Sequence, residues 1–234
     1  MRIRGDGVPL NLIVMLRFLA HFFSIICHPI FILTYMLLLL LMINPYEFGV
    51  NSIGQNKFLI LMVFSSTVFI PGAAILMMRP LGLIESLRLE DRQERIGPYI
   101  ITGIFYLWIF RNLLGQTNIP VLFKSFVLGA TIGLFLAFFI NLFSKISMHT
   151  VGMGGLLAMT LLVMGQASSS HFWFQLPFAQ FEMSLTSLLM TVILLSGIVG
   201  TARLLLRAHD PQEIYGGYLV GLLTQFIAFQ ILVN

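Results

Sequence analysis

Charged residues are scarce in this chain. Of its 234 residues only 9% are charged and 58% are hydrophobic, whereas a soluble domain carries roughly 25% charged residues. So few charges cannot cover the surface of a water-soluble fold. The composition therefore predicts an all-α integral membrane protein, built as a polytopic bundle of transmembrane helices.

Cysteine and clustered metal ligands are also lacking. Cys27 is the single cysteine, so no intramolecular disulfide can form, and no set of Cys and His residues has zinc-site spacing. The net charge of +4 comes from basic residues scattered between apolar stretches. This pattern disfavours nucleic-acid binding and favours contact with anionic phospholipid at a membrane surface.

Long apolar runs are what the chain does have. Since about 20 mostly apolar residues cross a bilayer, the sequence predicts seven crossings, within a range of six to eight. They lie near residues 20–43, 57–78, 98–115, 122–143, 150–166, 184–202 and 213–233. The first is the least well defined, because the apolar run starts at Leu10 and Pro29 could divide it. We expect one membrane domain, with an N-terminal anchor and first span in residues 1–56 and a core in residues 57–234.

Counting the crossings places three polar segments on the side of the membrane where the N-terminus lies. These segments are residues 79–97, 144–149 and 203–212. The basic residues on that side are Arg79, Arg88, Arg92, Arg95, Lys145, Arg203 and Arg207, and those on the other side or its flanks are Lys57, Arg111 and Lys124. We therefore expect one strongly cationic face at which segments distant in the sequence can meet.

The first polar segment contains Arg88 and Arg95 with six residues between them. On a helix this spacing is about two turns, so both side chains would project from one face. Guanidinium groups bind phosphate oxygens bidentately. The alternative is an interfacial segment whose arginines pair with neighbouring acids or with lipid headgroups.

The second segment contains Ser147 and His149, followed by Gly152, Gly154 and Gly155. A serine hydroxyl at a helix start can bind a phosphate oxygen, and a nearby histidine can protonate a leaving group. The alternative is an ordinary polar end of a span, with glycines that let helices pack closely.

The third segment contains Arg203, His209 and Glu213, followed by Gly217 and Gly221. A histidine nucleophile needs one unprotonated nitrogen and an acceptor for the proton on the other, and Glu213 is suitably spaced to accept from His209. Arg203 would hold the phosphoryl group. The alternative is an ion pair of Arg203 with an acid beside an interfacial histidine, together with a glycine packing motif.

Taken together, these segments resemble the signature of the type 2 phosphatidic acid phosphatase superfamily of membrane lipid phosphatases and phosphotransferases. That signature reads Lys-x6-Arg-Pro, Pro-Ser-Gly-His and Ser-Arg-x5-His-x3-Asp. This chain reads Arg88-x6-Arg95-Ile96, Ile146-Ser147-Met148-His149 and Ala202-Arg203-x5-His209-x3-Glu213. The order and internal spacing fit, while six positions carry a different residue type, Met148 in place of glycine among them.

The resemblance implies a metal-independent lipid phosphatase without a cofactor, with residues 57–234 as a phosphatase-like core. Four residues would bind the phosphate: Arg88, Arg95, Ser147 and Arg203. His209 would attack phosphorus, Glu213 would orient His209, and His149 would protonate the leaving alcohol. The substrate would be a membrane phospholipid or polyprenyl phosphate, and the location a bacterial inner membrane. A lipid phosphotransferase and a catalytically inactive phospholipid-binding membrane protein are the alternatives.

Three further histidines, His21, His28 and His171, are interpreted as hydrogen-bonded structural or interfacial groups. Gly129 and Gly133 form a common helix-packing pattern that is weak evidence for a dimer.

Overall fold

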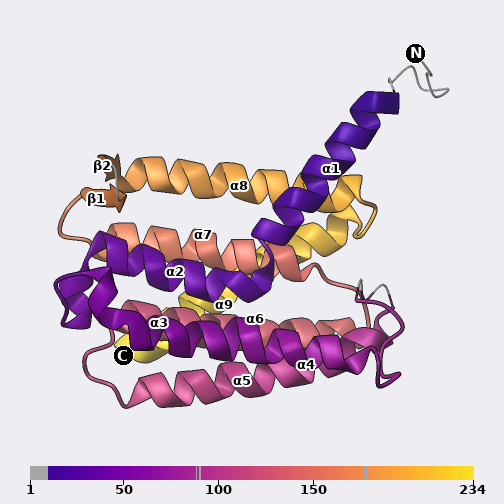
Figure 1. Cartoon of the computed structure of the whole chain (residues 1–234), viewed down its shortest axis with the longest axis horizontal. Helices are drawn as coiled ribbons and strands as arrows, with labels where there is room; N and C mark the ends of the chain where they lie inside the picture. The colour runs from indigo at the N-terminus through magenta and orange to yellow at the C-terminus, as the bar shows by residue number, and fades with distance from the viewer. Residues whose placement is uncertain (1–9, 88, 90, 177–178) are drawn as a thin grey trace.

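The computed structural model describes residues 10–87, 89, 91–176 and 179–234 (Figure 1). Over these residues the chain is an all-α bundle with one short hairpin, as the composition predicts. The helices are α1 (Leu10–Ile26), α2 (Pro29–Ile43), α3 (Lys57–Phe64), α4 (Ile70–Met78), α5 (Ile96–Leu114), α6 (Val121–Asn141), α7 (Met148–Gln166), α8 (Leu185–Leu205) and α9 (Pro211–Val233). A π-helical turn over Ser65–Phe69 joins α3 to α4, and short 3-10 helices cover Pro45–Phe48, Ile53–Asn56 and Gln93–Arg95.

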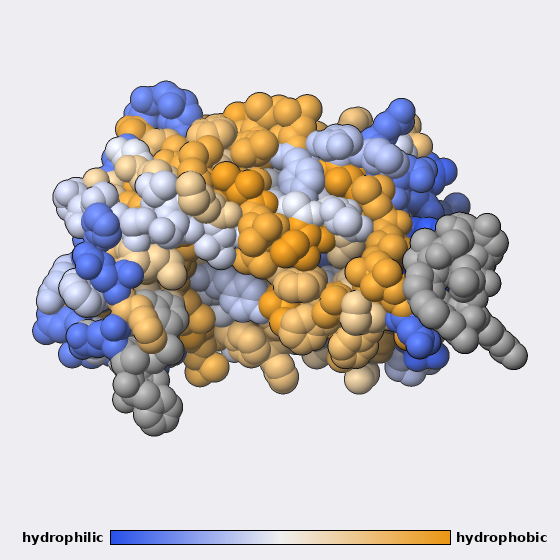
Figure 2. All heavy atoms as spheres, turned by 90° about the horizontal axis from the view of Figure 1, so that it is seen from above, coloured by the Kyte–Doolittle hydropathy of each residue, from blue (hydrophilic) through white to orange (hydrophobic). Residues whose placement is uncertain are grey.

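The helices form a multi-pass membrane protein. Five segments among the described residues are long and apolar enough to cross a bilayer: Pro45–Met78, Val121–Asn141, Met148–Gln166, Leu185–Leu205 and Pro211–Val233. The bent pair α1 and α2 makes a sixth if it is counted as one span. Figure 2 shows a broad apolar belt across the middle of one face, with hydrophilic side chains gathered at its two ends.

The third predicted crossing, residues 98–115, corresponds to α5. This helix has 19 residues and packs against α4 and α6, but it is not among the segments apolar enough to pass as spans. Polar and aromatic residues lower its apolarity, including Tyr99, Tyr106 and Arg111. By length and apolarity the described residues hold five spans, or six if α1 and α2 make one, against the predicted six to eight.

Pro29 divides the first apolar run, as its position suggested. The axes of α1 and α2 meet at a bend of 60°. Pro29 occupies the first turn of α2, and the His28 Nδ1 accepts a hydrogen bond from the Ile30 amide at 3.3 Å. A helix has to restart at this point, because proline lacks the amide proton that would continue the α1 ladder. Consequently α1 leaves the bundle at an angle and packs mainly on α8 (Figure 1).

The three polar segments meet at one end of the bundle, on the right of Figure 1. The ends of α4, α6 and α8 and the starts of α5, α7 and α9 all lie there. At the opposite end, β1 (His171–Leu176) pairs antiparallel with β2 (Ala179–Ser184). This hairpin occupies the segment in which the sequence predicts only a connection between spans.

Glycines set the close approach of α7 to α9, the most extensive helix contact of the bundle. A Cβ atom on Gly221 would overlap the Val151 carbonyl, and one on Gly217 would overlap the Thr150 hydroxyl. These two glycines on α9 therefore face α7, as expected of a glycine packing motif. The contact holds the start of α7 beside the start of α9.

Gly129 and Gly133 also pack helices within the chain. A Cβ atom on Gly129 would overlap Gln225, and one on Gly133 would lie 3.1 Å from the Thr224 hydroxyl. The pattern thus packs α6 against α9 inside the bundle, and these glycines supply no evidence for a dimer.

Candidate active site

A tight turn between α8 and α9 brings His209 back beside Arg203. The Ala208 amide donates to the Arg203 carbonyl at 3.1 Å and the Arg207 amide to the Leu204 carbonyl at 2.9 Å. These two bonds, with Arg207 in the left-handed region at φ 52°, make a Schellman motif at the end of α8. The five residues between Arg203 and His209 are thus enough to end α8 and reverse the direction of the chain.

Glu213 holds the His209 ring in one orientation. The His209 Nδ1 lies 2.5 Å from the Glu213 Oε2, and the two side chains are 4% and 16% exposed. Because Nδ1 donates to the carboxylate, Nε2 is the unprotonated nitrogen of the neutral ring. Glu213 is in the first turn of α9, where a negative charge is favourable.

The environment of His209 keeps its ring neutral. Burial lowers the pKa of His209 below its ordinary value of 6.5, and the positive charges of Arg203 and Arg95 act in the same direction. The hydrogen bond and charge of Glu213 oppose these effects by raising the pKa. The net shift is downward, so His209 has an available nitrogen lone pair at neutral pH.

His149 is oriented by a backbone carbonyl of α1. Its Nε2 lies 3.0 Å from the Ser24 carbonyl oxygen, which can only accept, so Nε2 carries the proton and Nδ1 is the acceptor of the neutral ring. The His28 ring packs edge-on against it, with centroids 5.0 Å apart and planes at 84°. The end of α1 and the break before α2 therefore orient His149.

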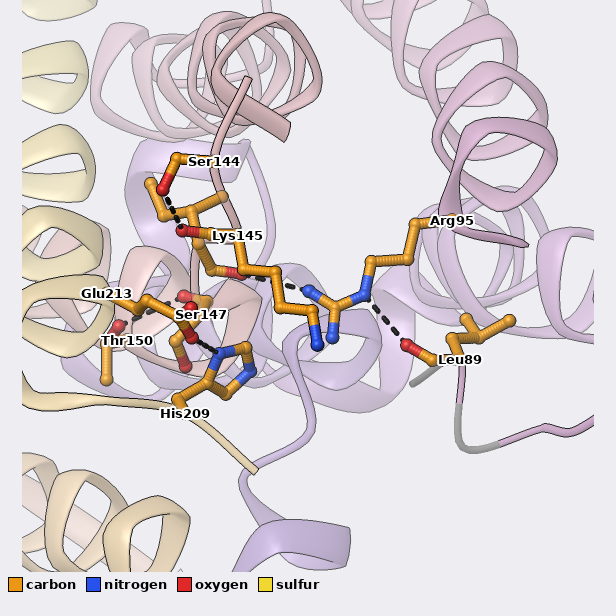
Figure 3. A network of polar contacts seen from close by, with 9 residues as sticks. Leu89, Arg95, Ser144, Lys145, Ser147, Thr150, His209 and Glu213 are labelled. Atoms are coloured by element: carbon orange, nitrogen blue, oxygen red, sulfur yellow. Dashed lines mark hydrogen bonds and ion pairs between the residues drawn. The ribbon is translucent and has the colours of Figure 1, made fainter. Parts of the chain in front are cut away.

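Arg95 is held over the site by two carbonyls. Its Nε donates to the Leu89 carbonyl at 2.8 Å and its Nη1 to the Ile146 carbonyl at 3.4 Å. Figure 3 shows Arg95 and His209 reaching toward the same space, with Lys145 extending between them in this view. The second contact ties Arg95 to the segment that carries Ser147 and His149.

The helical spacing expected for the first arginine pair is wrong. Arg88 lies outside the described residues, so its role stays a prediction. The residues described between α4 and Gln93 form turns and bends, and Leu89 has φ 51°. Asp91 and Glu94 accept from the backbone amides of Gln93 and Glu85, at 3.1 and 2.6 Å. These acids are engaged in shaping the loop.

Ser147 is the N-cap residue of α7, close to His149 in the sequence segment that reaches the site. Its amide donates to the Glu213 carbonyl at 3.3 Å and its own carbonyl accepts from the Thr150 hydroxyl at 3.0 Å. The side chain is fully buried, and the hydroxyl has no hydrogen-bond partner. Its neighbours Ile146 and Met148 line the cavity described next, whereas Ser147 does not. The predicted phosphate contact of Ser147 stays a prediction.

One cavity of about 230 Å³ joins the polar groups to the apolar interior. At its polar end lie four predicted site residues, namely Arg95, His149, Arg203 and His209. Arg203 has a buried Nε without a hydrogen-bond partner. The remaining wall is mostly apolar and includes Ile32, Leu33, Tyr106, Phe126 and Leu134. The arrangement can hold an anion at one end and a hydrocarbon group behind it.

His28 and the start of α2 were missed by sequence reasoning. His28 also lines the cavity, in addition to the structural hydrogen bond that the sequence interpretation assigned to it. Pro29 was the available signal, since irregular backbone within a membrane segment is tolerated where it faces protein or a cavity. The N-terminal part of the chain thus contributes wall to the same site as the predicted core.

Metal ligands do not cluster in the described part of the chain, where no group of three or more His, Cys, Asp or Glu could hold an ion. Comparison with models of known protein families, with curated proteins and with solved structures finds no match to this chain. Function is therefore inferred from the geometry of the cavity and from the motif resemblance.

Proposed function

We propose that this protein is a metal-independent membrane lipid phosphatase. It hydrolyses a phosphate monoester, or the terminal phosphate of a diphosphate, through a phosphohistidine intermediate. The observation that supports this most strongly is the pairing of His209 with Glu213, which leaves Nε2 free on a cavity that Arg95, Arg203 and His149 also line. An oriented imidazole beside two guanidinium groups is suited to nucleophilic attack on a phosphate.

In the first step, the His209 Nε2 attacks phosphorus and the bond from phosphorus to the lipid oxygen breaks. His149, protonated at Nδ1 while Nε2 stays bound to Ser24, gives that proton to the departing oxygen. Glu213 stabilises the positive charge that develops on His209. Arg95 and Arg203 neutralise the charge on the non-bridging oxygens, where fixed donors act with little reorganisation.

In the second step, neutral His149 takes a proton from water as the water oxygen attacks phosphorus. The bond from phosphorus to the His209 Nε2 then breaks, inorganic phosphate leaves and His209 returns to its neutral form. His149 is left protonated for the next cycle. Each histidine thus changes charge once in each direction, and no other proton acceptor is needed.

The substrate class follows from the two ends of the cavity. Two arginines at one end favour a phosphate, and the apolar wall behind them favours a hydrocarbon chain. A membrane phospholipid or a polyprenyl phosphate has both parts, whereas a nucleic acid lacks the second. A bacterial inner membrane is the proposed location.

The test is phosphate release by the purified protein from phosphatidate, phosphatidylglycerol phosphate and polyprenyl diphosphate. His209→Ala should lower turnover by at least about 10³-fold, since the nucleophile is lost. His171→Ala is the matched control, because His171 is an exposed hairpin residue at the opposite end of the bundle. Equal turnover in wild type and His209→Ala, or absence of turnover in wild type with every substrate, contradicts the proposal. Anion binding without turnover would instead indicate a phospholipid-binding protein.

A further inference from the structure

The cavity extends deep into the bundle from its cationic end. Along α9, the distance from Glu213 to Gln225 is about 18 Å at 1.5 Å per residue. From Arg95, the residue before α5, to Tyr106 on α5 the distance is about 16 Å by the same measure. The hydrocarbon of one leaflet is about 15 Å thick, half of the core of a bilayer. Tyr106 and Gln225 both line the cavity, so it ends close to the depth at which lipid chains end.

Gln225 places an unsatisfied acceptor at this deep end. The residue is 1% exposed, and its Nε2 lies 3.5 Å from both the Ser125 hydroxyl and the Met159 sulfur. The Ser125 hydroxyl gives its proton to the Leu122 carbonyl at 2.8 Å, so it accepts from Gln225. Both neighbours therefore select the nitrogen, which leaves Oε1 on the side of Gly129 without a donor.

The cavity is narrow and its width depends on small residues. Gly152, Gly155 and Ala130 line it. A Cβ atom on Gly155 would make only ordinary contacts, 3.8 Å from the Gly221 carbonyl and 3.9 Å from Phe126. Its volume of about 230 Å³ is below the range of about 300 to 1,000 Å³ usual for pockets that hold drug-sized ligands. There is room for one extended chain beside these residues, and a second chain would stay in the bilayer.

We propose that this cavity takes one hydrocarbon chain of a lipid phosphate, and that Gln225 limits the length of that chain. The Gln225 side chain closes the deep end, because it packs against Gly129 and its carbonyl is out of reach of water even in the empty cavity. A shorter chain leaves these contacts intact, whereas a longer chain has to displace Gln225 from Gly129, Ser125 and Met159, and overpacking of a filled site is costly. The preferred substrate is therefore a lipid phosphate whose chain is about as long as one leaflet is thick, rather than a long polyprenyl phosphate. The phosphate group in this statement rests on the proposed function, and the chain cavity rests on the geometry alone.

Binding of alkyl phosphonates tests the proposal without requiring turnover, because their carbon–phosphorus bond resists hydrolysis. Decyl-, tetradecyl- and octadecylphosphonate would displace a fluorescent alkyl phosphonate from the protein in lipid nanodiscs. The wild type should bind octadecylphosphonate about tenfold more weakly than tetradecylphosphonate, because the longer chain overpacks the deep end. Gln225→Ala should abolish this difference, since alanine leaves the deep end of the cavity open.

A pair of glycine substitutions supplies the control. Gly155→Leu should weaken tetradecylphosphonate binding at least tenfold and leave ethylphosphonate binding within about twofold, because the leucine fills the chain path and leaves the cationic end open. Gly197→Leu should change neither, since a Cβ atom on Gly197 meets nothing within 4 Å. This pair decides whether a chain occupies the cavity even if Gln225→Ala does not fold.

Equal affinity for all chain lengths in the wild type, or tetradecylphosphonate binding unaffected by Gly155→Leu, overturns the proposal. Chain-length selectivity in a protein that releases no phosphate would sink the proposed function and leave the chain cavity standing. Turnover without chain-length selectivity would overturn the chain cavity and leave the proposed function standing.

Discussion

Replacement of Glu213 tests the proposed pairing with His209 in detail. Glu213→Gln keeps an oxygen acceptor for Nδ1 and removes the negative charge. Hydrogen bonds to charged groups contribute about 1.5 to 3 kcal/mol and neutral ones about 0.5 to 1.5 kcal/mol. The loss on going from charged to neutral is then about 1 to 1.5 kcal/mol, which lowers kcat by about 5- to 13-fold. Glu213→Leu removes the acceptor as well and should lower kcat by about 13- to 150-fold by the same arithmetic.

The same substitution makes a prediction about pH with a fixed sign. Glu213 raises the pKa of His209 against the lowering by burial, while Arg95 lowers it. His209 attacks only when unprotonated, so activity falls with decreasing pH as the pKa of His209 is passed. Glu213→Gln should therefore move the acid limb of the kcat/KM profile to lower pH, and Arg95→Gln should move it to higher pH.

The assay is initial-rate phosphate release in mixed micelles, measured across the acid range for the wild type and both variants. Thermal unfolding of each variant serves as the control for folding. The pairing would be refuted if Glu213→Gln retained the wild-type kcat, or if both variants moved the acid limb in the same direction.

The remaining predictions concern stability, measured by thermal or chemical unfolding in detergent. Gly217→Ala should destabilise the protein by about 1 to 3 kcal/mol, because the added methyl group overpacks the contact with α7. Gly216→Ala has nothing within 4 Å of the added atom and should stabilise the protein by up to about 1 kcal/mol. Equal effects of the two substitutions would contradict the packing of α9 on α7. Arg207→Gly should stabilise by about 1 kcal/mol because it relieves the left-handed φ, and a loss of stability would contradict the Schellman turn. The pKa of His209 is lowered in the folded state, so the contribution of His209 to the free energy of unfolding is fully present above pH 6.5 and is lost as pH falls through the folded pKa. His209→Asn should flatten the dependence of this free energy on pH in that range. An unchanged slope would contradict the assignment.

The sequence predicted the parts of the site that depend on local geometry. The reversal from Arg203 to His209 is one helix terminus, and Glu213 lies in the first turn of α9, just after His209, so residue spacing determines both. The meeting of Arg95, His149 and His209 was expected from counting crossings. It holds because α5, although less apolar than the spans, runs the length of the bundle beside α6 and the pair returns the chain to the same end.

Contacts between distant segments could not be predicted. The hydrogen bond from His149 to the Ser24 carbonyl depends on how α1 leaves the bundle, which no residue near His149 encodes. The spacing of Gly129 and Gly133 indicates that another helix comes close, but only tertiary packing shows that this helix is α9. The expectation of helix before Arg95 failed because the chain there forms turns, with Leu89 in a left-handed conformation.

Trapping the phosphoenzyme tests the central claim most directly. The protein would be mixed with a lipid labelled in its phosphate, quenched within milliseconds and digested, and the labelled peptide would be tested for acid and base stability. A phosphohistidine at His209, labile in acid and stable in base and absent from His209→Asn, is the result that the proposed mechanism predicts. Label on a residue other than His209 would contradict the mechanism. So would turnover that is undiminished in His209→Asn, with no label trapped on the wild type under any quench condition.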